Sequence, residues 1–201
     1  MKFLHIKLSL LLILLSLSQN ELYAKSAHDY ADKVHKDIVQ VIKSQQNLLD
    51  ENPKEFTFLI SQAFSPIVDF ERISKNVMGR YYKDASSIQV KKFNEVFQLS
   101  LLKTYSRSLV EFQDERIIVL PELKPSTKEG RAKVYIEIIT STNTYPGMYS
   151  MYLDKNREWK IINIVINGVN LGITFRNQFY SLMKKNNNDI DKSISLWESS
   201  L

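Results

Sequence analysis

The sequence contains no cysteine, which excludes disulfide bonds and zinc sites built on thiolates. Glycine and proline are scarce, with 5 of each in 201 residues, and no linker or internal repeat divides the chain. There is no excess of one charge either, because 27 Lys and Arg are interleaved with 22 Asp and Glu. This balance argues against a nucleic-acid-binding surface. The sequence therefore predicts one domain, held together by its apolar core alone.

Catalytic motifs are also missing. The sequence has no G-x-S-x-G, H-E-x-x-H, G-x-G-x-x-G or P-loop pattern. His28, Asp32 and His35 lie at i, i+4 and i+7, a spacing that suits a metal ion, but a solvated helix face is the preferred interpretation. An isomerase-like enzyme would need an acid or a histidine facing a cavity, and the predicted inward strand positions hold neither. We therefore predict no enzyme, no metal site and no cofactor.

The N-terminus has the three parts of a secretory signal peptide. Two lysines precede an apolar run over 8–17, and the small residue Ala24 follows a short polar stretch. The run is shorter than the roughly 20 residues that a membrane-spanning helix needs. We expect cleavage after Ala24, which gives a signal peptide over 1–24 and a single exported domain over 25–201. An uncleaved membrane anchor is the alternative.

Helical periodicity dominates the first half of the exported chain. Apolar residues recur at spacings of three, four and seven. Asn52 is placed to cap one helix, and Asp69 and Gly79 are placed to begin and end another. The predicted helices cover 26–50, 53–64, 70–78 and 87–112. The longest helix, which Ser86 and Gln89 cap, carries an i, i+4 ladder of large apolar residues. The ladder consists of Phe93, Phe97, Leu101, Tyr105 and Leu109.

Alternating apolar and polar residues follow and predict antiparallel strands. These strands cover 116–120, 131–140, 148–154 and 158–166. Pro146 and Gly147 suit a type II turn, Lys155 and Asn156 a tight turn, and Gly168 ends the last strand. Two further helices are predicted over 171–182 and 190–197. The predicted fold class is α+β: a curved antiparallel sheet of about four strands packed against several helices, with a cavity between sheet and helices.

Two adjacent tyrosines, Tyr81 and Tyr82, lie at a predicted helix–helix corner beside Arg80 and Lys83. Tyrosine combines an apolar ring with a polar hydroxyl, so it suits a core edge and a cavity rim equally well. Apolar faces occur on every predicted helix and on one face of the sheet. This surplus of apolar lining, with few polar groups, is typical of a pocket for a hydrophobic ligand.

Two sequence blocks resemble MlaC, the toluene-tolerance (Tgt-type) family of periplasmic phospholipid-binding proteins. The first runs from Asp69 to Leu109, and the second, WKIINIVINGVNLGITFRNQF, runs from Trp159 to Phe179. The matching positions are Asp69, Phe70, Gly79, Tyr81, Tyr82, Lys83, Phe93, Phe97, Tyr105, Trp159, Gly168, Val169, Arg176 and Phe179. The sequence departs from the family pattern at Asn163 and Asn167, where an acid is usual, and at Asn170, where serine is usual.

The resemblance implies a monomeric periplasmic carrier whose cargo is a phospholipid. It also implies two partners: an inner-membrane ABC transporter that bears an MCE protein, and an outer-membrane lipoprotein–porin complex. The corresponding role is to maintain the lipid asymmetry of the outer membrane. If the apolar faces only form a core, the alternative is a periplasmic structural or adaptor module that binds no lipid.

The expected lipid-binding residues come from the tyrosine corner, the longest helix and the inward faces of two strands. They are Phe70, Val77, Met78, Tyr81, Tyr82, Phe93, Phe97, Leu101, Tyr105, Val134, Ile136, Ile138, Ile162, Ile164 and Ile166. The strand faces depend on register, because a slip of one residue moves every side chain to the opposite face.

Overall fold

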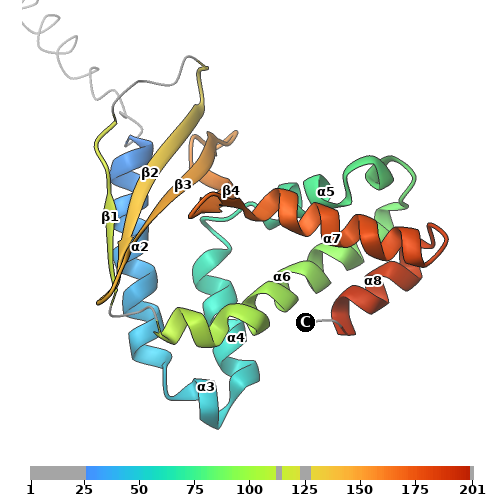
Figure 1. Ribbon diagram of the computed structural model, residues 1–201, viewed down its shortest axis with the longest axis horizontal. Coiled ribbons are helices and arrows are strands. Elements are labelled where there is room, and N and C mark those ends of the chain that lie inside the picture. Colours follow the sequence, from blue (N-terminus) through green and yellow to red (C-terminus); the bar gives the residue numbers. More distant parts are fainter. Residues whose placement is uncertain (1–25, 112–114, 123–127, 200–201) are drawn as a thin grey trace, which may run out of the picture.

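The computed structural model describes residues 26–111, 115–122 and 128–199 (Figure 1). The predicted signal peptide and its cleavage site lie outside these residues. The helices within them are α2 (Ala27–Gln45), α3 (Leu48–Glu51), α4 (Pro53–Phe64), α5 (Phe70–Met78), the 3-10 helix η1 (Gly79–Lys83), α6 (Ser87–Glu111), α7 (Leu171–Lys185) and α8 (Ile190–Ser199). The strands are β1 (Arg116–Val119), β2 (Arg131–Ile139), β3 (Thr144–Leu153), β4 (Trp159–Ile166) and β5 (Val169–Asn170).

The predicted fold class, α+β with an antiparallel sheet, is confirmed. The sheet has five strands in the order β1-β2-β3-β4-β5, one more than expected. The extra strand, β5, is only two residues long and pairs with Val165 and Ile166 after the turn at Gly168. At the start of β4, the segment after α4 adds a parallel bridge between Val68 and Ile161. This segment therefore ties the helices to the sheet.

The predicted turn at Pro146 and Gly147 is wrong, because both residues lie inside β3. The chain reverses earlier, where the backbone N–H of Thr140 donates to the carbonyl of Asn143 over 2.8 Å. Gly147 is needed for close packing rather than for a turn. A Cβ atom at this position would lie 2.6 Å from Cγ1 of Ile136 on the neighbouring strand.

The predicted helix caps are confirmed. The side chains of Asn52 and Asp69 accept hydrogen bonds from the first turns of α4 and α5. Ser86 and Gln89 form a reciprocal capping box before α6, with the backbone N–H of each residue donating to the other's side chain. These local bonds satisfy backbone donors that a helix start leaves without partners, so the boundaries of α4, α5 and α6 were predictable from short sequence motifs.

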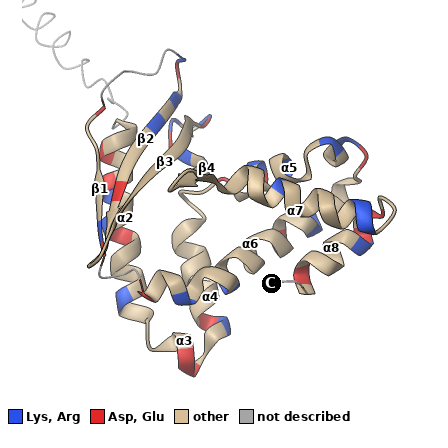
Figure 2. Ribbon diagram, viewed as in Figure 1, with Lys and Arg blue, Asp and Glu red and all other residues tan. Residues whose placement is uncertain are grey.

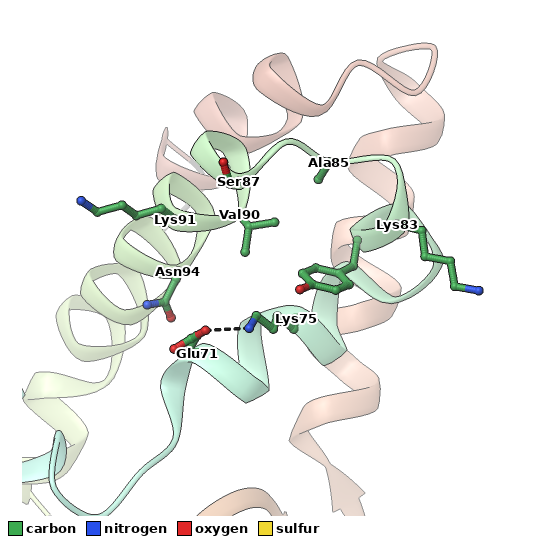
Figure 3. A pocket seen from close by; sticks show the side chains of 9 residues that line it. Glu71, Lys75, Lys83, Ala85, Ser87, Val90, Lys91 and Asn94 are labelled. Atoms are coloured by element: carbon green, nitrogen blue, oxygen red, sulfur yellow. Dashed lines mark hydrogen bonds and ion pairs between the residues drawn. The ribbon is translucent and has the colours of Figure 1, made fainter.

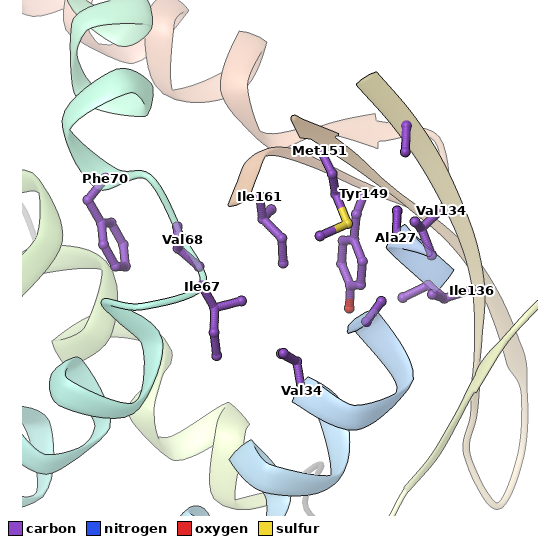
Figure 4. Close-up of a cluster of buried hydrophobic side chains, with 12 residues drawn as sticks. Ala27, Val34, Ile67, Val68, Phe70, Val134, Ile136, Tyr149, Met151 and Ile161 are labelled. Atoms are coloured by element: carbon purple, nitrogen blue, oxygen red, sulfur yellow. The ribbon is translucent and has the colours of Figure 1, made fainter. Parts of the chain in front are cut away.

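The helices and the sheet form two layers that meet along one side (Figure 1). In the first layer, α2 packs against β1 and β2, and in the second, α5, α6, α7 and α8 pack against one another. Three groups of buried apolar side chains fill these layers. We call them the sheet cluster, between α2 and the sheet (Figure 4), the aromatic cluster, between α5, η1, α6, α7 and α8, and the α4 cluster, between α2, α4 and α6.

Candidate functional site

Four half-buried apolar residues lie where the three clusters meet. Ile73 and Leu101 pack against both the sheet cluster and the aromatic cluster, and Ile38 and Phe64 pack against both the sheet cluster and the α4 cluster. We call these four residues the seam. They come from α2, α4, α5 and α6, so all the layers contribute to it. Because these side chains are only half-buried, they leave apolar surface in reach of solvent where neighbouring clusters adjoin.

Sequence reasoning identified only Leu101 of the seam. Ile38, Phe64 and Ile73 were missed because each belongs to the ordinary apolar face of its helix. Nothing in the sequence of a single helix shows that its apolar face contacts two clusters rather than one. The seam residues are identified by their tertiary contacts, which the periodicity of one helix does not reveal.

The sheet cluster contains the predicted residues Phe70, Val134 and Ile136, and Ile138 and Ile164 pack against it. Figure 4 shows Tyr149 and Met151 pointing from β3 toward the same interior as Val34 of α2, with Ile67, Val68 and Ile161 on the other side. The predicted inward face of β2 is therefore confirmed. Contact of these residues with lipid stays a prediction.

A β-bulge changes the inward face of β4. Met151 pairs with Ile161, whereas the preceding residue, Ser150, pairs with Asn163, so Ile162 has no partner in this ladder. Ile161 belongs to the sheet cluster, and the predicted Ile162 and Ile166 do not. The prediction of Ile162 as an inward residue is therefore replaced by Ile161. An extra residue in a strand shifts the alternation of its faces, and alternation alone does not reveal it.

The aromatic cluster holds five other predicted residues away from the sheet. Val77, Met78, Phe93 and Phe97 are at most 1% exposed, and Tyr81 is buried with them. Phe93 and Phe97 contact Trp197, with ring centroids 5.5 and 5.8 Å apart. The structure therefore does not bring these residues and the strand residues together around one cavity. In this structure they form a closed core.

Two predicted residues face solvent instead of an interior. Tyr105 is 43% exposed and Tyr82 is 38% exposed. For Tyr105 the reason is helical geometry. Each i, i+4 step rotates by about 40° beyond a full turn, so three steps place Tyr105 about 120° away from Phe93. The ladder from Phe93 therefore turns away from the core before it reaches Tyr105.

A polar pair joins α2 to the sheet inside the first layer. Nε2 of His35 lies 2.7 Å from the hydroxyl of Tyr149, and Nδ1 of His35 is buried without a hydrogen-bond partner among the described residues. Burial lowers the pKa of His35 to about 4, against a smaller opposing effect of Asp32. Burial also raises the pKa of Tyr149. Both groups are therefore neutral at pH 7, and the expected solvated face is wrong for His35.

Asp69 links α5 to β3, the central strand of the sheet. One carboxylate oxygen accepts from the backbone N–H of Arg72 over 2.8 Å, and the other accepts from the hydroxyl of Tyr152 over 2.5 Å. The guanidinium carbon of Arg72 lies 3.9 Å from the centroid of the Tyr152 ring. Burial, together with the hydrogen bond to Asp69, raises the pKa of Tyr152. These contacts fix the start of α5 and therefore one side of the seam.

The described ranges contain neither a cluster of metal-ligating residues nor a membrane-spanning helix. No group of three or more His, Cys, Asp or Glu residues in them is placed to hold a metal ion. Within the same ranges, every helix is too short or too polar to cross a bilayer.

A family model described as MlaC protein matches residues 32–199 of this chain. This chain belongs to the MlaC family. Toluene tolerance protein ttg2D of Pseudomonas putida is 31% identical over 176 residues, covering 87% of this chain and 80% of the relative. The intermembrane phospholipid transport system binding protein MlaC of Haemophilus influenzae is 25% identical over 146 residues, covering 70% of this chain and 65% of the relative.

A solved structure shares the fold of this MlaC family chain. It is the phospholipid-binding protein of Ralstonia solanacearum, determined in complex with a phospholipid. The TM-score is 0.77 at 21% sequence identity, and the match covers 86% of this chain and 95% of that one. The family that the sequence resembles is therefore confirmed, and the solved structure supports the fold.

The departures from the MlaC pattern have local structural roles here. The side-chain oxygen of Asn163 accepts from the backbone N–H of Gly172 over 3.0 Å, and Asn170 caps α7 by accepting from Ile173. Asn167 adopts φ 49°, a left-handed conformation that asparagine tolerates better than most residues. The asparagines therefore maintain the passage from β4 to α7 without the acids and the serine that the pattern usually has.

Proposed function

We propose that this chain is a periplasmic phospholipid carrier that shields the acyl chains of its cargo between the two membranes. It receives and delivers lipid at an inner-membrane ABC transporter bearing an MCE protein and at an outer-membrane lipoprotein–porin complex. Membership of the MlaC family carries the proposal, because one relative is named an intermembrane phospholipid transport binding protein. The seam supplies the apolar surface that such cargo needs.

The energetics favour a carrier with a lipid-like interior. Each methylene group kept from water contributes about 0.8 kcal/mol, so two acyl chains of about 15 groups each represent on the order of 24 kcal/mol. Such chains do not cross water unshielded at a useful rate. Relative to a bilayer the difference is small, because the chains are already dry there. An interior as apolar as a membrane therefore allows transfer in either direction, and partners must set the direction.

Acyl chains enter at the seam in this proposal, where the sheet layer separates from the helical layer. The proposal requires the seam residues to move apart, whereas the aromatic cluster, which is closed in this structure, stays closed. The head group remains in water. In this arrangement the acyl chains contact the inward face of the sheet. The predicted lipid contacts on that face are Val134, Ile136, Ile138 and Ile164.

Co-purified lipid tests the proposal directly. Full-length protein expressed with its N-terminal segment should carry a two-tailed phospholipid, measured by organic extraction and mass spectrometry. Leu101→Asp should reduce the lipid-to-protein ratio at least about tenfold, equivalent to about 1.4 kcal/mol, because a carboxylate in an apolar interior is costly. The matched control is Leu99→Asp on the same helix, where the side chain is 55% exposed.

Circular dichroism should show that both variants are folded before their lipid contents are compared. Background lipid in the wild-type protein would overturn the carrier proposal and favour the adaptor module. Equal lipid in Leu101→Asp and Leu99→Asp would place the entrance elsewhere than the seam.

Head-group selectivity should be low. Rejecting a wrong head group requires buried donors and acceptors that it leaves unpaired, whereas the seam residues are all aliphatic or aromatic. The cations at the tyrosine corner, Arg80 and Lys83, are exposed and attract any phosphate through screened charge. Loading the protein from equal amounts of phosphatidylethanolamine, phosphatidylglycerol and a third two-tailed lipid should return ratios close to the input. A preference above about tenfold would contradict this prediction.

A further inference from the structure

A groove runs between α5 and α6 on the outside of the helical layer (Figure 3). It encloses about 690 Å³, within the range of about 300–1,000 Å³ usual for ligand sites. We call it the α5–α6 groove. Its lining residues are Glu71, Lys75, Tyr82, Lys83, Ala85, Ser87, Val90, Lys91 and Asn94.

Among the described residues, two cations at the rims of the groove have no acidic partner, and a third is paired with an acid. Lys75 donates to the carboxylate of Glu71 over 2.6 Å, a hydrogen bond that raises the pKa of Lys75, so this pair is internally balanced. Lys83 and Lys91, in contrast, form no ion pair within the part of the chain that the structure describes. Figure 3 shows the two side chains on opposite rims of the groove, with their amino groups pointing outward from it. η1 adds one further exposed cation, Arg80, whereas basic and acidic residues are interleaved over the rest of the helical layer (Figure 2).

The floor of the groove is apolar and rests on closed packing. Ala85 and Val90 pack against the aromatic cluster from outside. Beneath them, Phe93 and Met78 are 0% exposed, so the groove does not communicate with the sheet cluster. Cargo acyl chains at the seam therefore do not reach it, and the groove needs a different occupant.

Polar donors complete the site. The side-chain oxygen of Asn94 accepts from the hydroxyl of Ser74 over 3.2 Å, which leaves its amide N–H groups to donate elsewhere. Ser87 adds an exposed hydroxyl on the first turn of α6. A peptide carbonyl matches these donors, a carboxylate matches Lys83 or Lys91, and an apolar side chain matches Val90.

We infer that the α5–α6 groove binds an acidic segment of a protein partner. The inference rests on the proposed carrier function, in which the chain must dock transiently at other proteins. A bilayer surface fits less well because it is broad and does not follow a concave groove to Ala85 and Val90. Exposed charges of this kind accelerate association and contribute little to final affinity, which suits a contact that must also be released.

Site-specific photo-cross-linking tests this inference. The photoreactive amino acid p-benzoylphenylalanine is placed at Ser87 in the full chain, produced in its native cells, and cross-linked peptides are sequenced by mass spectrometry. We expect peptides of another protein with a clear excess of Asp and Glu. The charge reversal Lys83→Glu with Lys91→Glu should lower the cross-link yield at least about tenfold. The matched control, Lys184→Glu with Lys185→Glu, changes two exposed lysines of α7 and should leave the yield unchanged.

Cross-links to lipid only, or to peptides without an acidic excess, would overturn the inference. A yield that survives the reversal at Lys83 and Lys91 would overturn it as well. Co-purified lipid separates this result from the carrier proposal, because neither double variant alters the seam and both should retain the wild-type lipid content. Failure of the carrier proposal would instead appear as absence of lipid in the wild-type protein, whatever the cross-links show.

Discussion

Replacing Trp197 by alanine is expected to lower the free energy of unfolding by about 3–5 kcal/mol. Trp197 is 0% exposed, and its ring lies within 6.4 Å, between centroids, of four phenylalanine rings. Those rings are Phe93, Phe97, Phe175 and Phe179. Removing the indole leaves a cavity that the four rings, held by α6 and α7, are too constrained to fill. Urea denaturation followed by circular dichroism measures the change.

Leu196→Ala is the matched control for this variant. Leu196 is the neighbouring residue on α8 and is 38% exposed, so its truncation should cost much less. The result also bears on the lipid-binding residues predicted within the aromatic cluster. A loss below about 1 kcal/mol for Trp197→Ala would show that the cluster is loosely packed and open to cargo. Phe93 and Phe97 would then return as candidate lipid contacts.

Acidification from pH 7 to pH 4 is expected to destabilise the wild-type protein by about 3 kcal/mol through His35 alone. Burial lowers the pKa of His35 from 6.5 to about 4 in the folded chain. Below pH 6.5 the unfolded chain binds a proton at this residue and the folded chain does not. The stabilisation is therefore complete above pH 6.5 and is lost as the pH falls toward 4.

His35→Gln isolates this contribution, because glutamine does not titrate and its amide retains a partner for the Tyr149 hydroxyl, which lies 2.7 Å from the histidine ring. Carboxylates also titrate in this range, but they do so in both proteins. Urea unfolding at several pH values should show a curve for wild type that falls more steeply than the variant curve. Parallel curves would mean that the imidazole is not held neutral between α2 and the sheet.

Much of the secondary structure was predictable because its determinants are local. The caps at Asn52, Asp69 and Ser86 depend on side chains that reach only three residues along the chain. The inward face of β2 followed from simple alternation, which holds where a strand is regular. Gly147 shows the limit of such reasoning. Pro-Gly is usually a turn signal, but here the glycine permits contact with Ile136 across the sheet.

The candidate site was harder to predict because its determinants are not local. The periodicity of apolar residues identified the apolar face of each helix. It did not identify the elements that pack against that face. Phe93 therefore appeared as a cavity wall, although α7 and α8 return to cover it. Ile161 was missed because a β-bulge in β4, opposite Ser150 and Met151, shifts the inward face of the strand by one residue. The alternation of apolar and polar residues does not show such a bulge.

The α+β class, the order of the main elements, the helix caps and the MlaC family could all be predicted, since each depends on periods and motifs along the chain. Three features became visible only in the folded chain. The apolar side chains divide into three clusters, Ile38, Phe64, Ile73 and Leu101 form a half-buried seam, and a basic groove lies outside the aromatic cluster. These features depend on burial, and burial results from contacts between segments that are distant in the sequence. The periodicity of a helix or strand indicates the direction in which a side chain points. Whether that side chain is buried depends on a segment from elsewhere in the chain that packs over it.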